Sequence, residues 1–206
     1  ILCIDKEISN AYYDFLEEKA NNCFLPITAS GRIKNINDAK RLFNIGVDRI
    51  IVNSLLWENN QETIEEISNI YGSQAIVASI DLLKVNNNFK SYDWIKKKPR
   101  ANLLPEILKN RTDLFGEIKI QSVDNDGGVS GPNILAINQI KNNVLYPIPL
   151  SYGSGLTSWN HYKICLKEDD VDCVSATNVH HMSETAAKSL KDYCIRNGID
   201  LRMPEE

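Results

Sequence analysis

Asp81 comes directly after an almost wholly apolar run at residues 76–80, which itself follows a turn at residues 72–74. Such a run is typical of a parallel strand that is covered on both faces. Enzymes built on parallel barrels place their catalytic groups where these strands end. A carboxyl group at such a place can act as a general acid or a general base. Asp81 is therefore the first candidate for a catalytic residue, and the alternative is a solvated aspartate in a turn.

Two loops that contain glycine and serine could bind phosphate. They are residues 29–32 and 151–155, and each follows an expected strand. Glycine lets the backbone approach an anion, and neighbouring N–H groups and hydroxyls can donate hydrogen bonds to it. Polar pairs at residues 53–54 and 177–178 end the next strand in each case. We therefore expect a ligand with a phosphate at each end, bound by Gly31, Ser54, Gly153, Ser154, Thr177 and Asn178.

The elements that position these residues are expected to alternate between strands and helices. Strands should begin near Ile1, Leu25, Arg49, Ala75, Glu117, Tyr146 and Asp172, and a helical stretch follows each of them. This alternation is typical of βα units that build a parallel sheet. The spacing after Asp81 is the longest and predicts an extended loop there.

Three of the helices have clear signals in the sequence. They lie at residues 35–43, 61–70 and 183–197, and the first and last are followed by a glycine, a common helix stop. The second carries Ile64, Ile67 and Ile70 at helical spacing. This spacing predicts that the three isoleucines form one buried face.

The chain consists of two similar halves. Residues 47–54 (VDRIIVNS) resemble residues 171–178 (VDCVSATN), and residues 26–31 resemble residues 149–153, at an offset of roughly 120 residues that indicates an internal repeat. Two halves of four units would give an eight-unit barrel, but only seven strands are expected. The strand that carries Asp81 lacks its counterpart, and the chain begins without Met. We therefore expect a single barrel domain over residues 1–206 that lacks its first strand and first helix.

Composition and charge narrow the class of protein. Apolar residues make up 43% of the chain and charged residues 24%, which is ordinary for one globular domain. The formal net charge of −4 argues against nucleic acid as a partner, and no apolar run reaches the length of a membrane span. Five scattered cysteines without a CxxC pair favour a cytoplasmic location. We expect neither a cofactor nor a metal, because no nucleotide-binding glycine pattern and no third ligand near the histidine pair at residues 180–181 is evident.

Six segments together resemble the HisF family, the cyclase subunits of imidazole glycerol phosphate synthase. They are residues 26–33 (PITASGRI), 38–39, 46–54 (GVDRIIVNS), 72–81 (GSQAIVASID), 122–127 (SVDNDG) and 197–202 (NGIDLR). The resemblance runs along nearly the whole chain from the second strand of the family onward. It implies a (β/α)8 TIM barrel of the ribulose-phosphate-binding type.

The resemblance also implies a glutaminase partner of the HisH type. In this family the partner hydrolyses glutamine, and ammonia crosses the barrel to the opposite mouth. There the ammonia reacts with a bisphosphate substrate and gives imidazole glycerol phosphate and an aminoimidazole carboxamide ribotide, a step of histidine biosynthesis. Asp81 matches one of the two catalytic aspartates of the family. The other belongs to the first strand, which we expect this chain to lack.

Further roles follow from the same resemblance. Asp5, Asp124 and Asp126 match carboxylates at the mouth of the barrel, and Asn53 matches a contact to the substrate. Gly127, in the segment at residues 122–127, joins the candidates for phosphate binding.

Three charged residues are expected at the other end of the barrel. Arg49 and Glu117 match residues that gate the entry of ammonia, and Arg49 stands where the family usually has lysine. Asp48 matches a position that faces the glutaminase. The alternative is that the three residues simply close the bottom of the barrel with polar groups.

The loops depart from the family more than the strands do. The first phosphate loop reads Ser30-Gly31-Arg32 where the family has three glycines, and residues 90–100 are basic with little family pattern. Trp57 and Trp94, in loops at the mouth, could cover a ligand. Two alternative functions therefore stay open. One is a HisF-like paralogue that delivers ammonia for sugar amidation in surface-glycan biosynthesis, and the other is a silent subunit that only activates a glutaminase.

Overall fold

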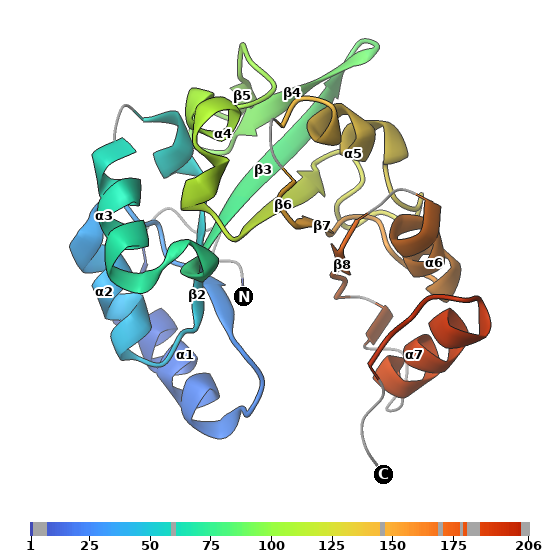
Figure 1. Ribbon diagram of the computed structural model, residues 1–206, viewed down its shortest axis with the longest axis horizontal. Helices are drawn as coiled ribbons and strands as arrows, with labels where there is room; N and C mark the ends of the chain where they lie inside the picture. The colour runs from blue at the N-terminus through green and yellow to red at the C-terminus, as the bar shows by residue number, and fades with distance from the viewer. Residues whose placement is uncertain are drawn as a thin grey trace.

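Strands and helices alternate along most of the chain, as the sequence predicts (Figure 1). The computed structural model describes residue 1 and residues 8–58, 61–144, 147–168, 171–177, 179–180 and 186–202. The strands are β1 (Thr28–Ser30), β2 (Arg49–Val52), β3 (Ile76–Val85), β4 (Asn88–Asp93), β5 (Lys98–Pro99), β6 (Glu117–Ser122), β7 (Leu150–Tyr152) and β8 (Cys173–Val174). The helices are α1 (Asn10–Asn22), α2 (Ile36–Asn44), α3 (Gln61–Tyr71), α4 (Glu106–Asn110), α5 (Ile134–Lys141), α6 (Trp159–Glu168) and α7 (Ala186–Arg196), with the short 3-10 helices η1 (Ser54–Trp57), η2 (Ser73–Ala75) and η3 (Thr112–Leu114).

Six strands form a curved parallel sheet in the order β1-β2-β3-β6-β7-β8, with helices around its outer side (Figure 1). This arrangement is that of a (β/α)8 TIM barrel and confirms the predicted fold class. Each of the six strands begins at the predicted residue or up to four residues after it. The strand expected near Ile1 falls on residues 2–7, which lie outside the described part of the chain.

The alternation of side chains along a strand decides which groups meet inside the curve of the sheet. On β3, Ile76, Ala78 and Ile80 belong to the hydrophobic core between the sheet and the helices. The alternate residues, which include Ser79 and Asp81, therefore face the opposite way, into the barrel. Both of these polar residues are buried.

The long spacing after Asp81 holds a β-hairpin, so the predicted extended loop is wrong. β3 continues to Val85 and pairs antiparallel with β4, and β4 in turn pairs with β5. The turn between β3 and β4 is two residues long and includes Asn86 at φ +57°, a conformation that asparagine tolerates better than most residues. Asp81 is thus not the last residue of its strand. It does lie near the end of the parallel sheet, because the pairing of β3 with β6 stops one residue later, at Leu82.

The predicted helices are present, with one error in their buried faces. Asn35 caps α2 in a capping box with Asp38. The side chain of Asn35 accepts from the backbone N–H of Asp38, and the side chain of Asp38 accepts from the backbone N–H of Asn35. In α3, Ile64 and Ile67 are buried as predicted, but Ile70 is 51% exposed. The last turn of α3 therefore faces solvent on the side where the sequence pattern predicts core.

The internal repeat is visible in matching hydrogen bonds. The carboxylate of Asp48 accepts from the backbone N–H of Ile27 at 2.7 Å. In the second half, Asp172 accepts in the same way from Leu150 at 2.8 Å. Each aspartate precedes one strand and holds the start of the strand before it, so the two halves fix neighbouring strands with the same contact.

No helix in the described ranges has both the length and the hydropathy that a membrane span needs. The four cysteines within those ranges are all free: Cys23, Cys165, Cys173 and Cys194.

Candidate functional site

Asp81 is held in the barrel by two hydrogen bonds to the same carboxylate oxygen. Its Oδ2 accepts from Asn53 Nδ2 at 3.0 Å and from Trp94 Nε1 at 2.6 Å. Asn53, which follows β2, also donates to the backbone carbonyl of Ser79 at 2.8 Å. The side chain of Asn53 therefore ties the end of β2 to the catalytic candidate.

Burial raises the pKa of Asp81 above the usual value for an aspartate, and the negative charge of Asp126 adds to this effect. The hydrogen bond from Trp94 and the positive charge of Lys119 act in the opposite direction. A carboxyl group with a raised pKa can hold a proton and release it during a reaction. This combination of burial and nearby charges is common at catalytic sites.

Lys119 is a residue of the site that the sequence analysis missed. It lies on β6 opposite Ser79, one step below Asp81 along the barrel. Its ammonium group lies close to Gly153, since a Cβ on that glycine would be 3.1 Å from Lys119 Nζ. Burial lowers the pKa of Lys119, while the charges of Asp81 and Glu117 act in the opposite direction. The barrel thus contains a cation between its two acidic groups.

The sequence did carry a signal for Lys119. Residues 117–122 read EIKIQS, and Ile118 and Ile120 are both buried in the core. Because side chains alternate along a strand, Lys119 must share its face with Glu117 and point into the barrel.

Arg49 and Glu117 lie together at the other end of the barrel, as predicted. Arg49 Nη1 and Glu117 Oε2 form an ion pair at 2.8 Å, and Arg49 Nε donates to the carbonyl of Gln74 at 3.2 Å. The hydroxyl of Ser151 donates to the second carboxylate oxygen of Glu117. These contacts link three strands across the bottom of the sheet. Asp48, beside them, is exposed and holds the N–H of Ile27.

Two of the predicted mouth carboxylates differ in what they do. Asp124 Oδ2 accepts from the backbone N–H of Lys84 at 2.6 Å, which ties the β6 end to the stem of the hairpin. Asp126 is exposed, and its charge acts on Asp81 and Lys119. Asp126 is therefore the better placed of the two to meet a ligand. Asp5 lies outside the described residues.

The glycines of the predicted phosphate loops have different surroundings. A Cβ on Gly31 would be 2.8 Å from Leu42 of α2, so this glycine is needed for packing of the first loop. A Cβ on Gly153 would come within 3.1 Å of the backbone oxygen of Ser175. Gly127 has φ +69° and open space around it. Of the three, Gly127 has the most room for an anion.

The candidate phosphate-binding residues that carry a hydroxyl group also differ in their burial and contacts. Ser154 is buried, and its hydroxyl accepts from the N–H of Ser122 at 3.0 Å and donates to the carbonyl of Gly153 at 2.7 Å. Ser54 begins η1 and is half-buried, and Thr177 is exposed. Asn178 lies outside the described residues. Ser154 therefore has a structural use in holding β6 and β7 together, while Ser54 and Thr177 remain accessible.

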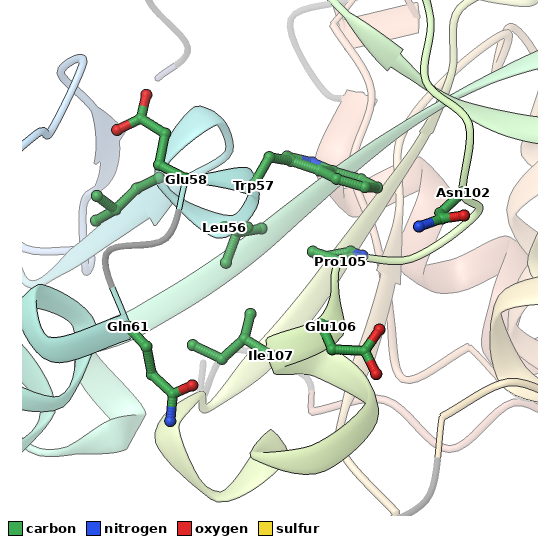
Figure 2. Close-up of a pocket in the computed structure, with 9 residues that line it drawn as sticks. Leu56, Trp57, Glu58, Gln61, Asn102, Pro105, Glu106 and Ile107 are labelled. Atoms are coloured by element: carbon green, nitrogen blue, oxygen red, sulfur yellow. The ribbon is translucent and has the colours of Figure 1, made fainter.

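Trp94, one of the two tryptophans that could cover a ligand, follows β4 and contacts both the hairpin and Asp81. The ring packs edge-on against Tyr92, with centroids 4.9 Å apart, while its N–H reaches Asp81. Two cavities are lined in part by Trp57. The one in Figure 2 has a volume of about 250 Å³ and is lined by η1 and the start of α4, with the Trp57 indole extending toward Asn102.

A buried acid near the carboxyl ends of parallel strands is typical of the active sites of (β/α) barrel enzymes. Comparison with known proteins agrees with this class. Residues 5–186 match the model of the family described as "Histidine biosynthesis protein". The chain belongs to this family.

Individual relatives extend over most of the chain. The imidazole glycerol phosphate synthase subunit HisF of Natranaerobius thermophilus is 31% identical over 191 residues, which are 92% of this chain and 75% of that protein. The HisF subunit of Leptospira biflexa is 31% identical over 192 residues, 91% of this chain and 74% of its own length. A relative in Campylobacter jejuni that carries the subunit name hisF2 is 29% identical over 209 residues, 98% of this chain and 80% of its own length.

Proposed function

We propose that the protein is the synthase subunit of a glutamine-dependent enzyme of the HisF type. It takes ammonia from a HisH-type glutaminase and forms imidazole glycerol phosphate and an aminoimidazole carboxamide ribotide in histidine biosynthesis. The observation that carries this proposal is Asp81, a buried carboxyl with a raised pKa at the mouth of the barrel. The relatives named HisF support the same assignment.

The residues described above have different roles along the barrel. Arg49 and Glu117 form the entrance on the side of the glutaminase, and Asp48 faces that partner. Ammonia then passes Lys119 and reaches the substrate beside Asp81. Asp81 acts as the general acid or base, because burial raises its pKa and so favours a form that can hold a proton and pass it to the substrate.

The substrate itself is a phosphorylated small molecule. Asn53 and Asp126 contact it at the mouth, and Ser54, Gly127 and Thr177 hold its phosphate groups. The three lie in accessible positions, and Gly127 has open space where a phosphate oxygen could approach the backbone.

A second candidate function is delivery of ammonia for amidation of a sugar. It is favoured by the first phosphate loop, where Arg32 has φ +47° and stands in place of a glycine. A bulky cation there changes the shape and the charge of the site. A silent activating subunit is disfavoured, since such a subunit has no need of the buried Asp81.

The test is a turnover assay with the bisphosphate substrate and ammonium salt, followed by formation of imidazole glycerol phosphate. The wild type and Asp81→Asn are compared, and stimulation of a glutaminase is measured for both. Turnover that is lost in Asp81→Asn while glutaminase stimulation persists would support the HisF-type function. A wild type that stimulates the glutaminase but never forms the product would refute it and favour sugar amidation.

A further inference from the structure

A cavity of about 360 Å³ lies between the β4–β5 hairpin and Trp57. This volume is at the lower end of the range for small-molecule sites. The cavity is separate from the barrel interior and is lined by residues 96 and 98–102 together with Trp57 and Asp93. It shares Trp57 and Asn102 with the cavity of Figure 2, so the two cavities adjoin at these residues.

The charge of this cavity is strongly positive although the chain as a whole is acidic. Lys96, Lys98 and Arg100 line it, with Asp93 as the one acidic side chain of the lining. Both lysines are exposed, and neither ammonium group forms a hydrogen bond or ion pair with any residue that the structure describes. Two cations in the cavity are therefore available to a ligand.

Arg100 forms the floor of the cavity. Its guanidinium pairs with Asp93 at 3.1 Å and lies over the Trp57 ring at 4.6 Å from the centroid. Its Nε is buried and, within the described residues, has no hydrogen-bond partner. A guanidinium carries five N–H donors and suits oxyanions that accept two hydrogen bonds. Asp93 pairs with Nη1, so the terminal nitrogens keep N–H groups that can donate to an anion in the cavity, whereas the buried Nε is out of reach of solvent.

The cavity is connected to Asp81 through the turn of the hairpin. Asp93 Oδ1 accepts from the backbone N–H groups of Ile95 and Lys96, both at 3.0 Å. Trp94, which lies between Asp93 and Ile95 in the chain, donates to Asp81. A ligand that contacts Lys96 and Arg100 would therefore rest on the same turn that places Trp94 at the mouth.

We propose that this cavity binds the anionic group, a phosphate or a carboxylate, of a polar small molecule at the edge of the mouth. Lys96 and Lys98 neutralise its charge, the Arg100 guanidinium donates hydrogen bonds to its oxygens, and the Trp57 face packs against its body. The binding does not depend on which molecule accepts the ammonia. It is a site additional to the phosphate loops of the barrel.

The test is lysine acetylation by acetic anhydride, read at each residue by mass spectrometry. Inorganic phosphate and glucuronate serve as the two anionic probes, at an ionic strength held constant with sodium chloride. We expect one or both probes to slow the labelling of Lys96 and Lys98. Lys97 is the matched control, because it lies between them in the chain and does not line the cavity. Protection by phosphate alone or by glucuronate alone would identify the kind of anion that the cavity prefers.

A variant makes the test independent of labelling. Lys96→Gln/Lys98→Gln should weaken binding of the protecting probe about tenfold or more in calorimetry, whereas Lys97→Gln should leave binding unchanged. Equal protection of all three lysines, or no protection by either probe, would overturn the proposal. No assay of turnover is involved, so this outcome is distinguishable from failure of the proposed function.

Discussion

Replacing Trp94 with phenylalanine removes one hydrogen-bond donor from Asp81 and little else. The phenylalanine ring can still pack against Tyr92, so the hairpin keeps its aromatic contact. A hydrogen bond to a charged group contributes about 1.5–3 kcal/mol to stability. Trp94 is 46% exposed, and water can partly replace its N–H, so we expect the low end of this range. For a chain of this size a loss of about 1.5 kcal/mol lowers the melting temperature by about 3–6 °C.

The effect should depend on pH in a defined direction. Because burial raises the pKa of Asp81, the folded protein holds this proton to a higher pH than the unfolded chain does. Stability from this group is therefore present at low pH and is lost as pH rises through the folded pKa. The Trp94 donor lowers that pKa, so Trp94→Phe raises it further. The destabilisation by Trp94→Phe should be largest above the folded pKa and should shrink as the pH falls below it.

The assay is thermal unfolding of the wild type and the variant over about pH 4 to 8. Trp57→Phe is the matched control, because Trp57 stacks on Arg100 and its N–H donates to no residue in the described ranges. The control should lose the same stability at every pH, since arginine stays charged throughout. A loss in Trp94→Phe that is equally independent of pH would refute the assignment of Trp94 as a donor to the ionised Asp81.

Two further predictions concern the charges in the barrel. Asp81→Asn should raise the melting temperature at pH about 8, because it removes a buried carboxylate that destabilises the fold when it is ionised. This gain should disappear at low pH, where the carboxyl group is neutral. Unchanged stability at high pH would contradict the burial of a carboxylate at this position. Lys119→Met should raise the pKa of Asp81, since the positive charge of Lys119 lowers it. A carbon-13 NMR titration of the Asp81 carboxyl checks this, and an unaltered titration would show that the two groups do not interact.

The parallel sheet could be predicted from the sequence because its central strands β2 and β3 are buried along almost all of their parallel length. Such strands are short apolar runs, and their starts are fixed by turn residues that stand out in the sequence. Arg49 and Glu117 begin β2 and β6 as predicted, and the repeat of Asp48 and Asp172 appears as one repeated hydrogen bond. The cap of α2 follows from local chemistry alone.

The errors in the prediction have physical causes that cannot be read from the sequence pattern of one strand or helix alone. Ile70 has the right spacing for the core, but it comes in the last turn of α3, beyond the surface that neighbouring elements cover. The hairpin was missed because β4 is largely polar and the turn contains two asparagines rather than the Asn-Gly pair that marks such turns most strongly.

The role of single polar groups was harder to predict than the fold. Ser154 has the residue type that binds phosphate, yet its hydroxyl holds two backbone groups of neighbouring strands. Lys119 was overlooked because a charged residue inside a barrel is unusual. For such residues the partner in space decides the role, and that partner is distant in the sequence.

The continuation of β3 beyond the barrel has a consequence for how such a protein can diversify. Strand β4 pairs with β3 and β5, so the tip of the hairpin can change in length and in charge without altering the strand pairs of the parallel sheet. Strand β3 also carries Asp81, so a change in the hairpin lies close to the candidate catalytic residue. Residues 86–100 can therefore change between relatives while the strand pairing of the parallel sheet stays the same.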